Sequence, residues 1–188
     1  MSKLGELKEI LKKLIAIPSV TGNEHDIAIY IADYLRQCGV DSVELQPVEG
    51  NRLNVVAHLK GEKAGPVVLL TGHMDTVAPG EGWRTDPFKA TERDGRIYGR
   101  GAADMKGGIA AILVAIRNAA AQREQMRGEA IIAFVCDEEA YSKGVDALIR
   151  SGIRADYGIA AEPEWDAVIG AVGKMLIKVR VYGIAAHG

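Results

Sequence analysis

The hydrophobic positions of this 188-residue chain first follow two helical patterns. Leucines recur every three or four residues from Leu4 to Leu14, with lysines and glutamates between them, which predicts an amphipathic helix over residues 3–16. Similar spacing predicts a second helix over residues 24–38, and Gly39 is a typical residue to end it. Both helices are interpreted as structural.

Apolar and alternating runs of strand length follow, separated by turns rich in glycine. They predict strands over Ser42–Val48, Leu53–Leu59, Val67–Thr71, Ala130–Cys136, Tyr157–Ala161, Val168–Val172 and Met175–Tyr182. The run that ends at Thr71 is continuously apolar, as is typical of a strand buried in a parallel sheet.

Three other segments lie between these strands. A loop over Thr76–Gly101 is rich in glycine and proline, and a loop of this length inside a domain is usually functional. A helix of small residues is predicted to begin near Met105, and a short helix over Val145–Ser151. The alternation of helices and strands predicts an α/β fold with a mostly parallel central sheet.

Composition and charge narrow the possible partners. With 48% hydrophobic and 26% charged residues, the chain has the composition of an ordinary α/β domain. A net charge of −2 with both signs interspersed offers no basic face, so we expect a small-molecule or peptide partner, with no nucleic acid and no membrane. Cys38 and Cys136 form no CxxC pair and are expected to be reduced thiols. Together with a start that does not resemble a signal peptide, they predict a cytoplasmic location.

Residues that can bind metal follow three of the predicted strands. His73 and Asp75 follow the first, Glu138 and Glu139 the second, and Glu162 the third. The carboxyl ends of parallel strands share one edge of a sheet, where ligands of α/β proteins bind. Acidic residues are common after strands, so any one of these strand ends is weak evidence for a metal site. Their occurrence after three strands is much stronger evidence.

Asp104 allows two interpretations. An aspartate directly before a helix is most simply an N-cap, and taken alone Asp104 would be one. A helix that returns to the same sheet would, however, also bring this carboxylate to the same crevice.

Several carboxylates in one crevice would repel each other unless a cation compensated their charge. One imidazole with several carboxylates and no thiolate suits zinc, manganese or cobalt. Asp75 is placed to orient His73. Adjacent glutamates normally point apart, so one of Glu138 and Glu139 is expected to bind metal while the other acts as general base.

The segments TGHMDTV, GRGAADMKGG, CDEE and AEP resemble the M20 family of zinc aminoacylases and exopeptidases. Within that family, they are most similar to the acetylornithine deacetylases and succinyl-diaminopimelate desuccinylases. The resemblance extends from Leu4 to Gly188 and implies the three-layer fold of zinc exopeptidases. It also implies a small N-acyl amino acid or a peptide as substrate.

The resemblance assigns a role to each candidate residue of a centre with two Zn²⁺ ions, for which Co²⁺ or Mn²⁺ could substitute. It implies that His73 and Glu162 bind one zinc, that Asp104 bridges both, and that Glu139 binds the second. Glu138 would then be the general base. In addition, Asp75 would orient His73, and His187 would help to hold the oxyanion across a dimer interface.

Family members are much longer than this chain, and their length implies a domain division. Residues 1–174 are expected to form the N-terminal part of the catalytic domain, and residues 175–188 the first strand of a truncated lid and dimerisation domain. The last histidine ligand of the second zinc would lie beyond residue 188. The full-length enzyme is expected to be a homodimer.

Two hypotheses follow from these observations. The first is a dinuclear zinc hydrolase of amide bonds, and the second is a non-catalytic metal-binding fragment of such an enzyme. A nucleotide-binding interpretation of Gly99-Arg100-Gly101 fails, because the third glycine of that motif is missing.

Overall fold

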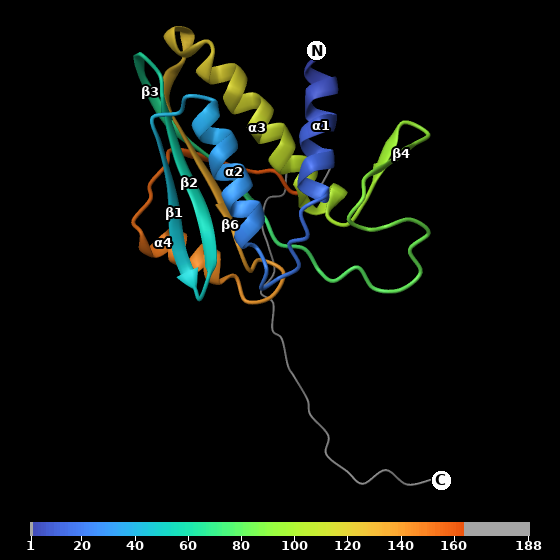
Figure 1. Cartoon of the computed structure of the whole chain (residues 1–188). Coiled ribbons are helices and arrows are strands. Elements are labelled where there is room, and N and C mark those ends of the chain that lie inside the picture. Colours follow the sequence, from blue (N-terminus) through green and yellow to red (C-terminus); the bar gives the residue numbers. More distant parts are fainter. Residues whose placement is uncertain (1, 164–188) are drawn as a thin grey trace, which may run out of the picture.

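The computed structural model describes residues 2–163 and contains a five-stranded sheet with helices on both faces (Figure 1). The order of the strands in the sheet is β1-β2-β6-β3-β7. These strands span Ser42–Glu49 (β1), Arg52–Lys60 (β2), Lys63–His73 (β3), Arg127–Val135 (β6) and Tyr157–Ala160 (β7). The helices span Lys3–Ile15 (α1), His25–Gln37 (α2), Gly107–Ala120 (α3) and Lys143–Arg150 (α4).

Four of the five strands run in the same direction. β3 pairs in parallel with β6 and with β7, whereas β2 pairs antiparallel with both β1 and β6. β2 is therefore the one strand of this sheet that runs the other way, and its first residues lie beside the last residues of β6. The predicted α/β class and the mostly parallel sheet are confirmed.

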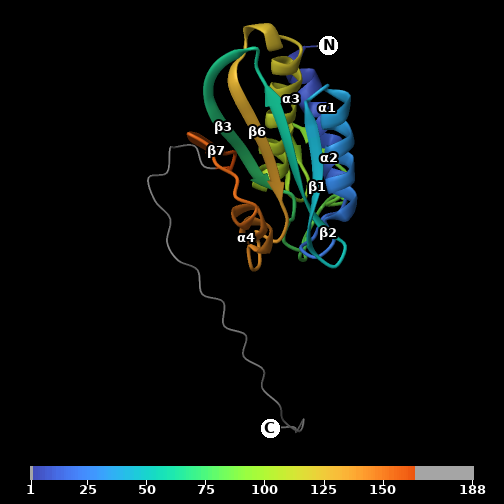
Figure 2. The same cartoon turned by 90° about the vertical axis from the view of Figure 1, so that its left-hand side faces the viewer.

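The helices form two layers around the sheet. α1, α2 and α3 cover one face and α4 lies on the other, as Figure 2 shows. Alternate residues of β6 explain this arrangement: Ile132 and Phe134 pack with α1, α2 and α3, whereas Ile131 and Ala133 pack with Leu148 of α4. A strand with two apolar faces has to be covered on both sides, which produces the expected three layers.

Two segments differ from the sequence-based predictions. The loop over Thr76–Gly101 contains a small hairpin of β4 (Thr91–Arg93) and β5 (Arg96–Tyr98), which turns through Asp94 and Gly95. Both turn residues have positive φ, as is typical of an Asp-Gly hairpin turn. The segment before α3 is an irregular turn, η1 (Ala102–Lys106), rather than the start of the helix. A short 3₁₀ turn, η2 (Arg123–Gln125), precedes β6.

Some predictions concern residues outside the described part of the chain. These are the strands over Val168–Val172 and Met175–Tyr182, the domain boundary after residue 174, and the role of His187.

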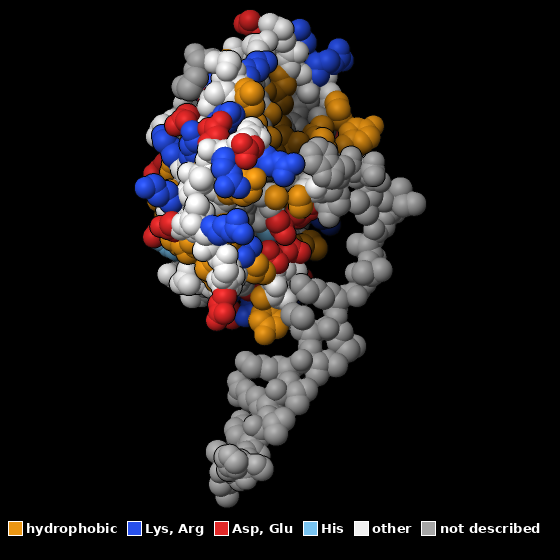
Figure 3. All heavy atoms as spheres, turned by 90° about the vertical axis from the view of Figure 1, so that its right-hand side faces the viewer, with side chains coloured by type: hydrophobic (Ala, Val, Ile, Leu, Met, Phe, Trp, Pro, Cys, Tyr) orange, Lys and Arg blue, Asp and Glu red, His pale blue; other side chains and the backbone are white. Residues whose placement is uncertain are grey.

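Within residues 2–163, no helix is long and apolar enough to cross a bilayer, and both cysteines are free thiols. On the face shown in Figure 3, acidic and basic side chains are interspersed.

Candidate metal centre

His73 is the last residue of β3, and its imidazole is held in one orientation. The ring is almost fully buried, with 2% of the residue exposed. Its Nδ1 lies 2.9 Å from the backbone carbonyl oxygen of Asp75 and 3.6 Å from the Asp75 carboxylate. A carbonyl oxygen can only accept a hydrogen bond, so Nδ1 carries the proton. In the neutral ring the lone pair is therefore on Nε2, the nitrogen that a metal would bind in place of a proton.

The Nε2 atom of His73 faces carboxylates from three separate segments. Asp104 Oδ1 lies 2.9 Å away, Glu162 Oε2 3.7 Å and Glu138 Oε2 3.9 Å. Ligand atoms of His73, Asp104 and Glu139 also lie within 4.8 Å of one another. The parallel arrangement of β3, β6 and β7 thus brings the carboxylates together at one edge, as predicted.

Asp75 is fully buried beneath these ligand atoms and is held by several donors. Its carboxylate accepts hydrogen bonds from the Thr21 hydroxyl at 2.9 Å and from the backbone amides of Glu138 and Glu139 at 3.0 and 3.1 Å. Burial raises the pKa of a carboxyl group, but the His73 imidazole and these donors outweigh burial and hold the pKa of Asp75 below its usual range. An ionised Asp75 therefore connects β3 to the turn after β6.

The negative charges of the carboxylates around His73 favour a positive charge among them, either on the imidazole or on a bound metal ion. Burial lowers the pKa of the imidazole, but Asp75, Glu162 and Asp104 outweigh burial and raise the pKa of His73 to about 9. Burial raises the pKa of Glu139, and the neighbouring Asp104 carboxylate adds to this rise. One imidazole nitrogen and several carboxylates, with no thiolate among these ligand atoms, form a donor set that fits zinc, manganese or cobalt.

Asp104 is not the N-cap of α3. The helix begins at Gly107, the cap position is Lys106, and the cap makes no side-chain hydrogen bond. Asp104 itself has an extended backbone (φ −112°, ψ 101°), and its carboxylate points to His73 instead. The simpler interpretation of this residue is therefore wrong.

Contacts on two sides hold the η1 turn in place. Met105 is buried, and its sulfur accepts the backbone N–H of His73 at 3.0 Å. Lys106 is fully buried, and its ammonium donates to the carbonyl oxygens of Leu14 and Ile17 at the end of α1. Burial lowers the pKa of Lys106 to about 8. The turn that carries Asp104 is thus attached both to β3 and to α1.

Comparison with known proteins assigns the chain to a family. The model of peptidase family M20/M25/M40 matches residues 69–181, a segment that contains all the candidate residues from His73 to Glu162. The chain belongs to peptidase family M20/M25/M40. The predicted resemblance is confirmed.

Relatives and solved structures of the M20 family agree with this assignment. The succinyl-diaminopimelate desuccinylase of Bordetella petrii is 35% identical over 191 residues, which cover 95% of this chain and 49% of the relative. An M20 family metallo-carboxypeptidase from Sulfolobus solfataricus superimposes with a TM-score of 0.73 at 25% identity, over 83% of this chain and 37% of that protein. Human carnosine dipeptidase 1 has a TM-score of 0.72 at 25% identity, over 83% and 38%.

The chain spans about half the length of the curated relatives that it matches. The fold of the described residues is that of the M20 family. Of the site residues expected from the sequence, six lie together and His187 lies outside the described residues.

Thr21 contacts the candidate site through Asp75, although the sequence patterns did not indicate it. It lies in the loop after α1, where Val20 forms an isolated parallel bridge with Thr76. Fifty-four residues separate Thr21 from Asp75, so no local periodicity could connect them. A hydroxyl residue in a loop gives no signal of this kind by itself.

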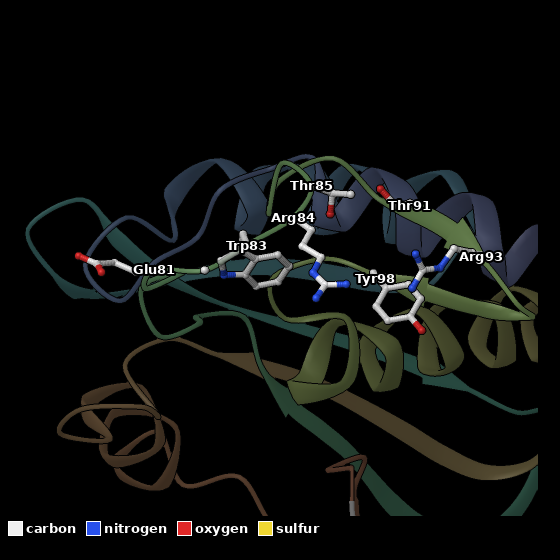
Figure 4. Close-up of a pocket in the computed structure, with 8 residues that line it drawn as sticks. Glu81, Trp83, Arg84, Thr85, Thr91, Arg93 and Tyr98 are labelled. Carbon is white, nitrogen blue, oxygen red and sulfur yellow. The ribbon is translucent and has the colours of Figure 1, made fainter.

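A surface pocket of about 340 Å³ lies in the long loop between Asp75 and Asp104. Figure 4 shows Arg84 between the rings of Trp83 and Tyr98, with Arg93 beside Tyr98. None of the residues that line this pocket belongs to the carboxylate cluster; they are Glu81, Gly82, Trp83, Arg84, Thr85, Thr91, Arg93 and Tyr98. The pocket and the candidate metal ligands are thus distinct sets of residues within the described part of the chain.

Gly108 allows the first turn of α3 to approach the segment that carries Glu162. A Cβ atom at this position would lie 2.1 Å from the carbonyl oxygen of Ala161. Gly108→Ala is therefore expected to separate α3 from this segment and to cost about 1–3 kcal/mol of unfolding free energy, the usual cost of overpacking. Zinc affinity should also fall, because Glu162 is displaced. Thermal unfolding and zinc titration measure the two effects.

Gly158→Ala is the matched control, since Gly158 lies on β7 and a Cβ there would meet no atom within 4 Å. Equal melting temperatures for the two variants would contradict the proposed close approach at Gly108.

Proposed function

We propose that this chain provides most of a dinuclear zinc centre in a hydrolase of amide bonds. The observation that carries the proposal is the orientation of His73, whose Nδ1 is held by a backbone carbonyl while Nε2 faces carboxylates from three segments. A buried imidazole held in this tautomer, with its free nitrogen among carboxylates, is typical of a metal ligand. Without a bound cation, the carboxylates of this cluster would repel each other.

The assignment of the metal ligands follows the positions of the side chains. His73, Asp104 and Glu162 would hold one ion, and Asp104 would share its carboxylate with a second ion held by Glu139. Asp104 suits the bridging role because its carboxylate contacts His73 and also lies in the group that includes Glu139. Zinc is the proposed ion, with Co²⁺ or Mn²⁺ as substitutes.

When bound, zinc would act as a Lewis acid that polarises the substrate carbonyl and lowers the pKa of water. Glu138 is the proposed general base. Its side chain is 43% exposed and lies beside the cluster, so its carboxylate can take a proton from the attacking water and donate it to the leaving nitrogen. Asp75 holds the His73 ring and the amides of Glu138 and Glu139 in place.

The proposed substrate is a small N-acyl amino acid or a peptide. The desuccinylase name of the curated relatives supports a deacetylase or desuccinylase activity, and the dipeptidase and carboxypeptidase names of the solved structures support the wider class. A domain boundary after residue 174, a role for His187 in holding the oxyanion, homodimerisation of the full-length enzyme and a cytoplasmic location belong to the same proposal.

Zinc stoichiometry tests the proposed centre directly. After chelator treatment, calorimetric titration of the 188-residue chain with zinc is expected to give two ions per chain, the second bound more weakly. Far-UV circular dichroism verifies that the metal-free chain is folded. A folded chain that binds no zinc would contradict the proposal.

Metal binding without turnover is the second candidate, because the chain spans about half the length of its curated relatives. One zinc ion per chain and no hydrolysis of N-succinyl amino acids would favour it. Two ions with measurable hydrolysis would exclude it.

A further inference from the structure

Arg52 forms a buried ionic group with two carboxylates, next to the carboxylate cluster but not part of it. Its Nε donates to Glu24 at 2.9 Å and its Nη2 to Asp137 at 2.8 Å. The Arg52 side chain is 11% exposed, while Glu24 and Asp137 are 0% and 1% exposed. Replacing such a group by apolar residues is often neutral for stability, so stability alone does not explain a buried ionic group.

The direction of β2 explains how Arg52 reaches this place. Because β2 runs antiparallel to β6, its first residue lies at the edge of the sheet where β6 ends. Asn54, two residues along β2, strengthens the connection: its side-chain oxygen Oδ1 accepts the backbone N–H of Cys136, and its side-chain Nδ2 donates to the backbone carbonyl of Gly144. The start of β2 thus holds both ends of the turn that follows β6.

Asp137 is the residue through which Arg52 acts on this turn. Its carboxylate accepts from Arg52 and from the backbone N–H of Lys143, and its carbonyl accepts the backbone N–H of Ser142 at 2.7 Å. Its φ of 69° is in the left-handed region, which is uncommon for a residue other than glycine. This backbone turn directs the next two amides, those of Glu138 and Glu139, toward the carboxylate of Asp75.

We propose that Arg52 is a positioning residue, which together with Glu24 fixes Asp137 and so keeps the carboxylates of Glu138 and Glu139 within reach of His73 and Asp104. The inference deepens the proposed metal centre and rests on it for its functional consequence. Arg52 itself contacts neither the ligand atoms nor the general base in the described contacts. Its effect is therefore on the geometry of the turn.

Zinc titration of Arg52→Met is the first test. Loss of a residue that orients metal ligands typically weakens metal binding by about 10- to 100-fold, and this loss is expected here. Arg52→Lys keeps the charge but cannot form the two-pronged contact, so it should recover only part of the affinity.

Arg117→Met is the matched control. Arg117 also pairs with a buried glutamate, Glu6, but on α1 and α3, away from the turn. The Arg117 side chain is half exposed, so this variant should lose less thermal stability than Arg52→Met and keep its zinc affinity within about twofold of wild type. Equal loss of zinc affinity in Arg52→Met and Arg117→Met would overturn the positioning role.

Amide hydrogen exchange measured by NMR on the metal-free chain is the second test. The amides of Glu138 and Glu139 should exchange at least tenfold faster in Arg52→Met, and at the wild-type rate in Arg117→Met. Unchanged exchange at these amides in Arg52→Met would overturn the inference whatever the zinc result. Wild-type chain that binds no zinc would instead contradict the proposed function, while the exchange rates would still decide whether Arg52 holds the turn. If Arg52→Met does not fold, Arg52→Lys takes its place in both tests, with smaller effects in the same direction.

Discussion

Asp104→Ala is expected to remove zinc from both sites of the chain. Asp104 lies 2.9 Å from His73 Nε2 and in the same group as Glu139, so its loss affects both proposed ions. Changes around a metal ligand typically cost about 10- to 100-fold in affinity, and loss of the shared ligand should cost at least the upper value at each site. Glu139→Ala, by contrast, should mainly empty the second site. Calorimetric titration with zinc measures both variants.

Asp33→Ala is the control for this experiment. The Asp33 side chain is 56% exposed on α2, close to the 54% of the Asp104 side chain, and its carboxylate pairs only with Arg36 among the described contacts. Its removal should leave two zinc ions bound. Asp104→Ala should also fold with nearly the wild-type melting temperature, because its side chain is exposed. An Asp104→Ala chain that still binds two ions with wild-type affinity would contradict the bridging role.

Glu138→Gln is expected to abolish most of the hydrolysis without removing metal. General acid–base catalysis contributes about 10²- to 10⁴-fold to a rate, and glutamine keeps the size of the side chain but cannot take up the proton. The backbone amide of residue 138 would still donate to Asp75, so the turn should remain in place. Turnover of an N-succinyl amino acid should fall by this factor in a catalytically active form of the protein, while zinc stoichiometry stays at two.

Two comparisons make the result specific to Glu138. Glu9→Gln, an exposed position on α1 that pairs with Lys12, should leave both turnover and metal content unchanged. Glu139→Gln should lower both, because Glu139 is the proposed metal ligand. Wild-type turnover in Glu138→Gln would mean that another group takes the proton, and the assignment of the general base would be wrong.

The different roles proposed for Glu138 and Glu139 rest on the different surroundings of their side chains. Both backbone amides donate to the carboxylate of Asp75, so the main chain of the two residues is held as a unit. Their side chains differ in surroundings: Glu138 is 43% exposed, whereas burial next to Asp104 raises the pKa of Glu139. A partly buried carboxylate near another carboxylate gains most from a cation, and an exposed one can reach a substrate.

The order of helices and strands could be predicted from the sequence because both patterns are local. A repeat of 3.6 residues indicated α1 and α2, and apolar runs indicated β3 and β6, with boundaries that differ from the structure by a few residues. The site could also be predicted in part. His73, Glu138, Glu139 and Glu162 follow parallel strands, and the ends of such strands meet at one edge whatever the details of packing.

Other features were decided by contacts between residues far apart in the chain. The tautomer of His73 depends on a carbonyl that the fold places beside it, and the role of Asp104 depends on an irregular turn attached to β3 and α1. The turn that carries Glu138 and Glu139 is held by Arg52, 85 residues before Asp137. Because β2 runs antiparallel to β6, Arg52 at the start of β2 lies close to Asp137 after the end of β6.

The sequence by itself therefore determined which residue types lie at the edge of the sheet, since local periodicity sets the elements and strand direction sets their ends. Only the tertiary structure decided how those residues are oriented. Orientation arises from hydrogen bonds such as those of Thr21 and Arg52, whose partners lie 54 and 85 residues away. Hydrophobic periodicity contains no information about such pairs, because it records only which side of an element is buried.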